Sequence, residues 1–296
     1  MAVRTLVRTC PGLRLVNLVH ARLSPRARRR LFHLCCDETW RVEGDWTVDF
    51  AGRRLTLPLT REFPDAWLAA IGFHGYDPQV HALYEALVRG PRPPRVVFDV
   101  GASYGLHALR FLVHGARVIA FEPNPECHPR FRAWCAANSV PCELVPVAVG
   151  DRTDSVVLTF PEGRTYLGSI VPDVCAEWRG PVRVLTVPQV ALDDVVTAHG
   201  VVPDLVKIDT EGAELAVLRG AVDLLRTAQP LLVFEAWRNA DVRRALWSIL
   251  DKHGYAIAAI DGATPHALTR VEFCGAHATN FLAEVSAGRV IHSARQ

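Results

Sequence analysis

The pattern of hydrophobic and polar positions changes character near residue 91. Upstream of that point, residues 46–60 alternate apolar and polar side chains around Ala51-Gly52, which predicts a β-hairpin. The segment Pro91-Arg92-Pro93-Pro94 then interrupts the pattern. We therefore divide the chain into an N-terminal helical and β-hairpin appendage, residues 1–90, and a larger domain, residues 91–296.

Short apolar runs alternate with helical patterns throughout the larger domain. Near-continuous apolar runs suit strands that are covered on both faces. Apolar positions with helical spacing lie between them, over 215–225 and 242–250. This alternation predicts a mostly parallel, doubly wound α/β sheet. The predicted core strands are 96–100, 118–121, 144–147, 205–208 and 231–234. Extra β segments inserted before the fourth core strand are predicted at 155–160, 166–171 and 182–187.

Composition excludes several protein classes. The 296 residues are 50% hydrophobic and 22% charged, as in an ordinary globular protein. No run approaches the roughly 18 apolar residues of a membrane helix, so no transmembrane segment is expected. The net charge of +2 gives no reason to expect a nucleic-acid partner.

The N-terminal 36 residues carry eight arginines and no acidic residue. A solvated basic helix packed on the main domain is the favoured interpretation, and a transit peptide or membrane-surface helix is the alternative. The eight cysteines of the chain lack the paired spacing of zinc ligands, and no secretory signal precedes them. We therefore expect reduced cysteines and a cytoplasmic location.

A glycine turn follows the first core strand, in the run Asp99-Val100-Gly101-Ala102-Ser103-Tyr104-Gly105. Glycine lets the backbone approach a ligand more closely than a Cβ atom would allow. The third glycine of the dinucleotide fingerprint is missing, which disfavours a nicotinamide-dependent oxidoreductase. An acidic Asp99 is a poor neighbour for phosphate but a good partner for an ammonium group or a ribose.

Glu122 directly follows the second core strand and precedes Pro123. In open α/β sheets, ligands lie across the carboxyl ends of adjacent strands, so Glu122 is placed to accept hydrogen bonds from both ribose hydroxyls. Asp99, the glycine turn and Glu122 together predict an adenosyl cofactor without phosphate. S-adenosylmethionine fits, with its aminocarboxylate beside the glycine turn.

Three carboxylates lie within six residues at the end of the fourth core strand: Asp209, Glu211 and Glu214. Carboxylates next to a buried strand are costly unless they are used. The alternative is that they favour the positive end of the following helix. We interpret Asp209 and Glu211 as catalytic, with Glu235 in the same layer at the end of the fifth core strand.

Five runs together resemble the FkbM family of S-adenosylmethionine-dependent methyltransferases, over about residues 70–285. They are Val-Phe-Asp-Val-Gly-Ala-Ser-Tyr-Gly (97–105), Phe-Glu-Pro-Asn-Pro (121–125), Val-Ala-Val-Gly-Asp (147–151), Lys-Ile-Asp-Thr-Glu-Gly-Ala-Glu (207–214) and Phe-Glu (234–235). The segment 278–282 is similar to the family's closing strand. Ser103 stands where the family usually has Asn, and Asp77 stands where it usually has Glu.

The resemblance implies a class I, Rossmann-like methyltransferase fold, with a mostly parallel seven-stranded sheet and an antiparallel last strand. It implies S-adenosylmethionine as cofactor and a hydroxyl group of a sugar, polyketide or related small molecule as acceptor. The expected cofactor-binding residues are Asp99, Gly101, Ala102, Ser103, Gly105, Glu122, Pro123, Asp151 and Tyr76. The expected substrate-side residues are Glu235, His74, Tyr166 and Ser169.

We expect methyl transfer to an acceptor oxygen, whose proton passes to Asp209, Glu211 or a nearby histidine. His266 and His277 are weaker candidates for that base. No metal is expected, because Phe234-Glu235-Ala236-Trp237 stands where metal-dependent O-methyltransferases usually carry an Asp-Asn pair.

Two alternatives remain open at this point. One is a carboxyl or N-methyltransferase acting on a peptide or metabolite, and the other is a non-catalytic S-adenosylmethionine-binding partner protein. The sequence leaves the oligomeric state open.

Overall fold

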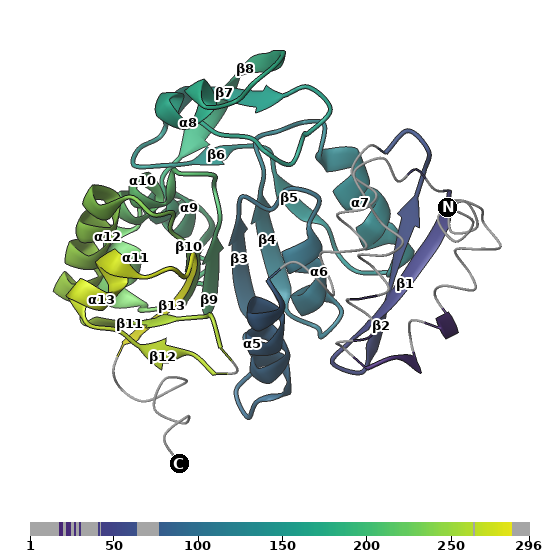
Figure 1. Cartoon of the computed structure of the whole chain (residues 1–296), viewed down its shortest axis with the longest axis horizontal. Coiled ribbons are helices and arrows are strands. Elements are labelled where there is room, and N and C mark those ends of the chain that lie inside the picture. The colour runs from purple at the N-terminus through teal and green to yellow at the C-terminus, as the bar shows by residue number, and fades with distance from the viewer. Residues whose placement is uncertain are drawn as a thin grey trace.

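The computed structural model describes residues 43–63, 77–262 and 264–285, together with scattered positions between residues 18 and 41. Within these residues, an eight-stranded sheet with the strand order β12-β11-β13-β10-β9-β3-β4-β5 forms the centre of the fold (Figure 1). The elements, in chain order, are β1 (Gly44–Phe50), β2 (Arg53–Leu59), α5 (Pro78–Arg89), β3 (Val96–Val100), α6 (Leu106–Leu112), β4 (Arg117–Phe121), α7 (His128–Ala137), β5 (Glu143–Val145), β6 (Ala148–Val149), β7 (Asp154–Pro161), α8 (Pro172–Ala176), β8 (Val182–Val190), α9 (Leu192–His199), β9 (Leu205–Ile208), α10 (Glu214–Arg219), α11 (Val222–Thr227), β10 (Leu231–Glu235), α12 (Ala240–Lys252), β11 (Tyr255–Ala259), β12 (His266–Ala267), α13 (Arg270–Gly275) and β13 (Asn280–Val285).

Five neighbouring strands of this sheet run parallel: β10, β9, β3, β4 and β5. The last strand, β13, lies between β10 and β11 and is antiparallel to both. The predicted α/β fold with an antiparallel last strand is therefore confirmed. The sheet has one strand more than the seven predicted, because the two-residue β12 pairs with β11 at its edge.

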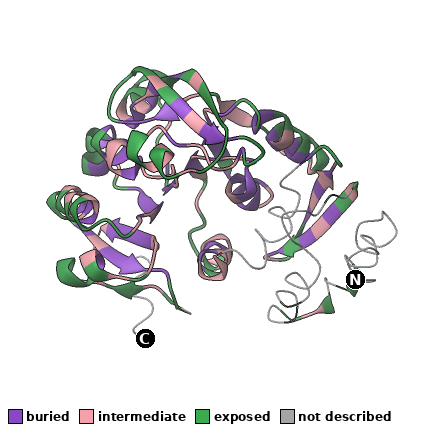
Figure 2. Cartoon of the chain, turned by 45° about the horizontal axis from the view of Figure 1, so that its top comes forward, coloured by how far each residue is buried: buried purple, intermediate pink, exposed green. Residues whose placement is uncertain are grey.

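Both faces of the sheet are covered, which explains the continuous apolar runs. Successive strand residues enter opposite hydrophobic clusters: Val97 packs with α5, α6 and α7, whereas Phe98 packs with α9 to α13. Figure 2 shows buried residues along the central strands and on the helix faces that turn toward them. The sheet thus has two apolar layers, and polar groups gather at its ends.

The predicted hairpin is present as β1 and β2, which pair antiparallel around Ala51-Gly52. It packs on α7: Trp134 Nε1 donates a hydrogen bond to the carbonyl of Pro58 at 3.0 Å, and Asn138 bonds both backbone groups of Thr56. The hairpin and α5 belong to the same hydrophobic cluster as α6 and α7. The division of the chain at residue 90 stays a prediction.

The inserted region forms a separate three-stranded sheet in the order β6-β8-β7. The β segments predicted at 155–160 and 182–187 are confirmed, because they lie within β7 and β8. The strand predicted at 166–171 is wrong: it contributes one isolated bridge, between Thr159 and Ser169. Its other backbone donors serve local turns, since Leu167 bonds the carbonyl of Arg164 and Val171 bonds the hydroxyl of Ser169.

The helical pattern over 215–225 also differs from the prediction, since it is split into α10 and α11. Gly220 lies between the two helices, where a Cβ atom would meet the carbonyl oxygen of Gly150 at 2.0 Å. Close packing of the chain against Gly150 therefore interrupts the helix. The helix predicted at 242–250 is confirmed as α12.

No helix in the described ranges combines the length and apolar character required to cross a bilayer.

Two glycines with similar backbone angles allow the energetic cost of a steric clash to be separated from the cost of backbone strain. Gly105 has φ +81° and a Cβ there would lie 2.1 Å from the Phe131 ring, whereas Gly115 has φ +85° and open space. We expect Gly115→Ala to lower the free energy of unfolding by about 1 kcal/mol through backbone strain alone. Gly105→Ala should cost at least about 2 kcal/mol more, because the ring must move. Urea denaturation of both variants would measure this, and equal losses would contradict the packing role of Gly105.

Candidate cofactor and active site

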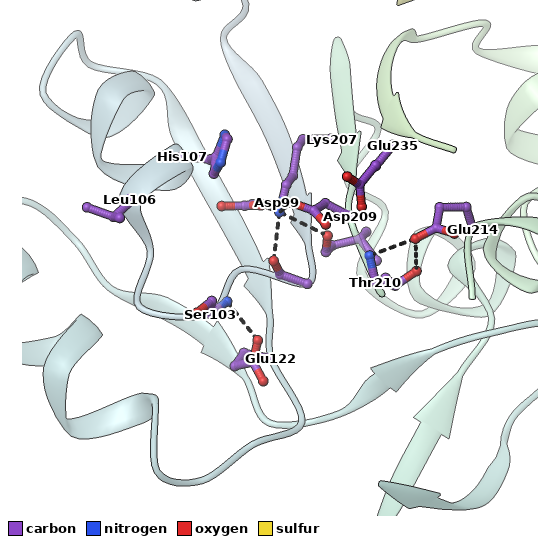
Figure 3. A network of polar contacts seen from close by, with 12 residues as sticks. Asp99, Ser103, Leu106, His107, Glu122, Lys207, Asp209, Thr210, Glu214 and Glu235 are labelled. Carbon is purple, nitrogen blue, oxygen red and sulfur yellow. Dashed lines mark hydrogen bonds and ion pairs between the residues drawn. The ribbon is translucent and has the colours of Figure 1, made fainter. Parts of the chain in front are cut away.

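The polar residues gather where β3, β4, β9 and β10 end, at the carboxyl edge of the parallel sheet (Figure 3). Two adjoining cavities open at this edge. They share one wall, made by Gly101, Ser103, Tyr166, Asp209 and Glu211. The predicted glycine turn, both predicted catalytic carboxylates and one predicted substrate-side residue are therefore brought together.

The first cavity has a volume of about 620 Å³ and lies between the end of β4 and the inserted region. Glu122 and Pro123 line it, as predicted, beside the apolar residues Val147–Val149. The insertion covers the opposite side with Leu158, Thr165, Gly168 and Ile170. A flat, mostly apolar group with a polar edge fits this lining.

The glycine turn lies against the end of β9. Gly101 has φ +72°, and a Cβ atom on it would lie 1.8 Å from the carbonyl oxygen of Asp209. The amides of Gly101 and Ala102 both donate to the carbonyl of Phe121 at 3.0 Å. The turn thus needs glycine at position 101 and presents Ser103 to both cavities. Gly105, by contrast, lines neither cavity and serves the packing of Phe131.

Glu122 is held with both carboxylate oxygens in fixed positions. Oε2 accepts from the amide of Ser103 and Oε1 accepts from the amide of Asn124, each at 2.7 Å. Each oxygen keeps a further lone pair for a second donor. Burial raises the pKa of Glu122 to about 7, although the two amides favour the ionised form.

The cradle formed by Glu122 and the glycine turn fits a nucleoside cofactor. Two fixed acceptor oxygens match a pair of ribose hydroxyls, and Gly101 and Ser103 line the cavity beside them. The apolar residues at 147–149 line the same cavity and would contact the base of such a cofactor. S-adenosylmethionine therefore fits the residues that are present.

The second cavity, of about 1250 Å³, lies on the other side of the shared wall. The predicted Ala102 and Glu235 line it. Several further lining residues were not predicted as site residues, among them Asp77, His81, His107 and Trp237. Asp77 and His81 lie at the start of α5, where the sequence analysis noted Asp77 only as a departure from the family pattern, and His107 follows the glycine turn on α6. The sequence signal that could have identified these residues was their position: they are polar side chains near the start of a helix, close to a family motif.

The carboxylates of the fourth-strand motif divide into two roles. Asp209 and Glu211 face both cavities. Glu214 instead closes the turn, because its Oε1 accepts from the amides of Thr210 and Gly212 and from the Thr210 hydroxyl. The alternative interpretation, a structural role at the helix start, therefore holds for Glu214.

Lys207 and Asp99 form a buried ion pair beneath the glycine turn. Nζ of Lys207 lies 3.1 Å from Oδ1 of Asp99, donates to the carbonyl of Gly101 at 2.7 Å and lies 3.8 Å from Asp209. Burial lowers the pKa of Lys207, but Asp99 and Asp209 outweigh it and the pKa is raised. Asp99 lines neither cavity, so the structure places it under the turn and against Lys207.

Glu211 and Glu235 lie in an environment that favours their protonated forms. Burial, followed by the charge of Asp209, raises the pKa of Glu211 to about 8 and that of Glu235 to about 9. Glu211 has φ +54°, and its carbonyl accepts a hydrogen bond from Ser169 Oγ at 2.7 Å. Trp237 Nε1 donates to Oε2 of Glu235 at 2.8 Å.

The remaining predicted residues lie away from the cavities or outside the described ranges. Asp151 is exposed beside Arg152 and lines neither cavity. Ser169 is buried behind the shared wall, where it holds Glu211. His74 and Tyr76 lie outside the described residues. His266 and His277 are exposed and line neither cavity.

Across residues 43–63, 77–262 and 264–285, no three His, Cys, Asp or Glu side chains converge to hold a metal ion.

Comparison with known proteins identifies the Methyltransferase FkbM domain over residues 99–257. The hexuronic acid methyltransferase AglP of Haloferax volcanii is 30% identical over 139 residues, which cover 47% of this chain and 54% of AglP. The 31-O-demethyl-FK506 methyltransferase FkbM of Streptomyces tacrolimicus is 29% identical over 196 residues, covering 57% of this chain and 75% of that protein. The alignment thus spans only about half the length of AglP.

Among solved structures, a methyltransferase FkbM from Methylobacillus flagellatus KT is similar, with a TM-score of 0.44 and 18% sequence identity over 75% of this chain and 54% of that one. The fold and the cofactor cradle define a class I methyltransferase, and S-adenosylmethionine is the cofactor. The matched domain spans more than half of the chain, and the chain belongs to the FkbM methyltransferase family.

The raised pKa of Glu235 gives a prediction about stability and pH. A carboxyl whose pKa is higher in the folded state than its ordinary value of 4.5 makes the folded state less stable as pH rises from about 4.5 to about 9. Glu235→Gln removes this titration, so we expect the variant without cofactor to be about 1–2 kcal/mol more stable than wild type at pH 8.

At pH 5 the Glu235→Gln variant and the wild type should differ little, because little of the titration has occurred. Thermal unfolding at both pH values measures the effect, which should be a few degrees at pH 8. The exposed Glu143, changed to Gln, is the matched control. If the variant is no more stable than wild type at pH 8, ionisation of the Glu235 carboxyl does not destabilise the folded state.

Proposed function

We propose that this chain is an S-adenosylmethionine-dependent O-methyltransferase that acts on a hydroxyl group of a small molecule. One observation carries the proposal: two cavities, one lined by the fixed carboxylate of Glu122 and the other by further carboxyl and imidazole groups, meet at Asp209 and Glu211. A donor whose nucleoside lies in the first cavity and whose methionine arm enters the second would bring its methyl group to that wall, where an acceptor in the rest of the second cavity would meet it.

The residues that would hold the cofactor are those of the cradle. Glu122 would accept hydrogen bonds from the ribose hydroxyls, Ser103 and Gly101 would form the wall beside them, and Pro123 with Val147–Val149 would contact the base. Bound S-adenosylmethionine supplies an electrophilic methyl group on its sulfonium. The contribution of the protein is then to align the acceptor oxygen with that methyl group and to exclude water, and alignment supplies several kcal/mol.

The acceptor class draws on the relatives. AglP is a hexuronic acid methyltransferase, and the FkbM protein acts on 31-O-demethyl-FK506. A sugar or polyketide-type hydroxyl in the second cavity is consistent with both. Trp237 and Tyr166 offer apolar surfaces to such a molecule, and the carboxyl and imidazole groups offer hydrogen bonds to its hydroxyls.

Asp209 is our first choice for the group that takes the acceptor's proton. It faces both cavities, and about 38% of its side chain is exposed. Its carboxylate oxygen lies 3.8 Å from Nζ of Lys207, and a carboxylate is the form that a general base needs. Glu211 is the second candidate in the same wall.

Glu122→Ala tests the cofactor cradle. Loss of the two acceptor oxygens should weaken S-adenosylmethionine binding by about 1.5–3 kcal/mol, the range for hydrogen bonds to a charged group. Isothermal titration calorimetry measures this change, with Glu143→Ala as a control that should leave binding intact. Unchanged affinity in Glu122→Ala would move the ribose site elsewhere.

Asp209→Asn tests the chemistry. We expect the variant to bind S-adenosylmethionine within about tenfold of wild type, while turnover falls by about 10²-fold or more. The acceptor is sought by mass spectrometry of metabolites from cells with and without this gene, as a gain of about 14 daltons, one CH₂. Wild type but not Asp209→Asn should restore that product.

Direct catalysis by a carboxylate also predicts that the enzyme keeps its activity in EDTA. Activity that vanishes in EDTA and returns with Mg²⁺ would instead make the carboxylates metal ligands. An Asp209→Asn enzyme with normal turnover would assign the base to another residue, with Glu211 examined next.

A further inference from the structure

The wall shared by the two cavities is acidic. Asp209 and Glu211 face both cavities, and Glu235 faces the second. The three residues come from the ends of β9 and β10, which are neighbouring parallel strands. Figure 3 shows Asp209 and Glu235 directed toward the same space above the glycine turn.

The ammonium group nearest to this wall is already committed. Nζ of Lys207 lies 3.1 Å from Asp99 and donates to the carbonyl of Gly101, so most of its charge is balanced beneath the turn. It lies 3.8 Å from Asp209, and neither Glu211 nor Glu235 forms an ion pair with it. One ammonium therefore serves several carboxylates.

Among the other titratable groups of the described residues that line the wall or lie behind it, one carries positive charge: the buried guanidinium of Arg110, which lines neither cavity and lies behind His81. Asp77 on α5 adds another carboxyl, and Glu214 lies behind the turn of the motif. Nε2 of His81 lies 2.7 Å from a nitrogen of Arg110, so the imidazole accepts a hydrogen bond and is neutral. His107 on α6 is also neutral at pH 7, because burial and then the charge of Lys207 lower its pKa well below the ordinary value.

A separate feature of the wall points to a ligand. The Oγ atom of Ser103 is buried and has no hydrogen-bond partner within the described ranges of the chain, although Ser103 lines both cavities. Buried hydroxyl groups in native proteins are usually satisfied. A polar group of a bound molecule at the junction would satisfy this one.

The inference rests on the proposed function. In S-adenosylmethionine the sulfonium joins the ribosyl arm to the methionine arm, so a cofactor that occupies both cavities has its positive sulfur at their junction. We propose that Asp209, Glu211 and Glu235 are the counter-charge for this sulfonium, and that the site therefore binds S-adenosylmethionine in preference to the neutral product S-adenosylhomocysteine.

The protonation states support this role and give its pH dependence. Without cofactor, Glu211 and Glu235 are largely protonated at neutral pH, since burial and Asp209 raise their pKa values to about 8 and about 9. A nearby cation lowers the pKa of a carboxyl group. Binding of the sulfonium therefore releases protons, and its affinity rises with pH up to about these values.

The same carboxyl groups balance the charge during turnover. The bond between sulfur and methyl breaks with its electron pair left on sulfur, and the acceptor oxygen forms a bond to the methyl carbon. The acceptor's O–H bond breaks, and the proton goes to a carboxylate of the wall. The carboxyl groups of the wall therefore release a proton when the cofactor binds. They take up a proton when methyl transfer removes the positive charge on sulfur, and this weakens binding of the product S-adenosylhomocysteine.

Calorimetry on the full chain tests the inference without knowledge of the acceptor. S-adenosylmethionine and S-adenosylhomocysteine are titrated at pH 6.5 and 8.5, each in two buffers of different ionisation enthalpy. For S-adenosylmethionine we expect binding about tenfold tighter at pH 8.5, with proton release. For S-adenosylhomocysteine we expect a change of about twofold or less.

Two variants separate the contribution of the protein from that of the ligands' own amino groups. Glu235→Gln should reduce the pH effect on S-adenosylmethionine to about threefold or less, with little change for S-adenosylhomocysteine. The surface variant Glu143→Gln should retain the wild-type ratio at both pH values.

The outcomes distinguish the two proposals. Equal pH dependence for both ligands, or equal weakening of both by Glu235→Gln, would overturn the counter-charge role and leave the proposed function standing. If neither ligand binds at any pH, the proposed function fails and the inference fails with it.

Discussion

The buried ammonium of Lys207 is the interaction on which the site depends. It ties the end of β9 to the turn after β3 through Asp99, the carbonyl of Gly101 and the nearby Asp209. A buried ion pair gains its energy only when geometry and further hydrogen bonds compensate the loss of water, and losing one partner costs several kcal/mol. The absence of a side chain at Gly101 permits this approach. The two loops that carry the glycine turn and the proposed catalytic carboxylates are thereby held as one unit.

The inserted region completes this unit from outside the main sheet. The backbone carbonyl of Thr165 accepts a hydrogen bond from Asn124, two residues beyond Glu122, and its hydroxyl is hydrogen-bonded to Tyr104 in the glycine turn. Farther along the insertion, Ser169 holds the strained backbone of Glu211. The insertion thus contacts the loops that follow β3, β4 and β9. Its role is to fix the positions of groups that the sheet alone leaves at the ends of separate strands.

Sequence reasoning correctly predicted those strands whose local hydrophobic pattern matches their buried position in the fold. The strands at 96–100 and 205–208 have the predicted limits because both of their faces are buried, and the parallel sheet then brings Glu122, Asp209 and Glu235 to one edge. The helix break at Gly220 was missed because it depends on Gly150, 70 positions away in the sequence. The helix propensity of the residues around Gly220 gives no information about a contact so distant in the sequence.

The assignments within the site were harder, because the same residue type serves packing and binding. Gly105 looked like part of a ligand turn, but its missing side chain accommodates Phe131. Asp99 looked available to a cofactor, but its carboxylate forms an ion pair with the buried ammonium of Lys207. His81 and His107 gave no sequence signal, since one comes from α5 and the other from α6 and only the fold places both at the second cavity. Burial and pairing, which decide such roles, are properties of the folded chain.

The arrangement of charge explains why the site contains carboxyl groups that lower the stability of the folded protein. Glu211 combines a left-handed backbone with a carboxyl group whose pKa is raised by burial and by Asp209, and Glu235 lies in the same field. Such features cost stability and persist where function requires them. A neutral side chain at either position would fold more easily. It would also remove from the junction of the cavities a carboxyl group that, under the proposed counter-charge role, would balance the positive sulfur of the methyl donor, and the cost to the fold would then be the counterpart of the chemistry.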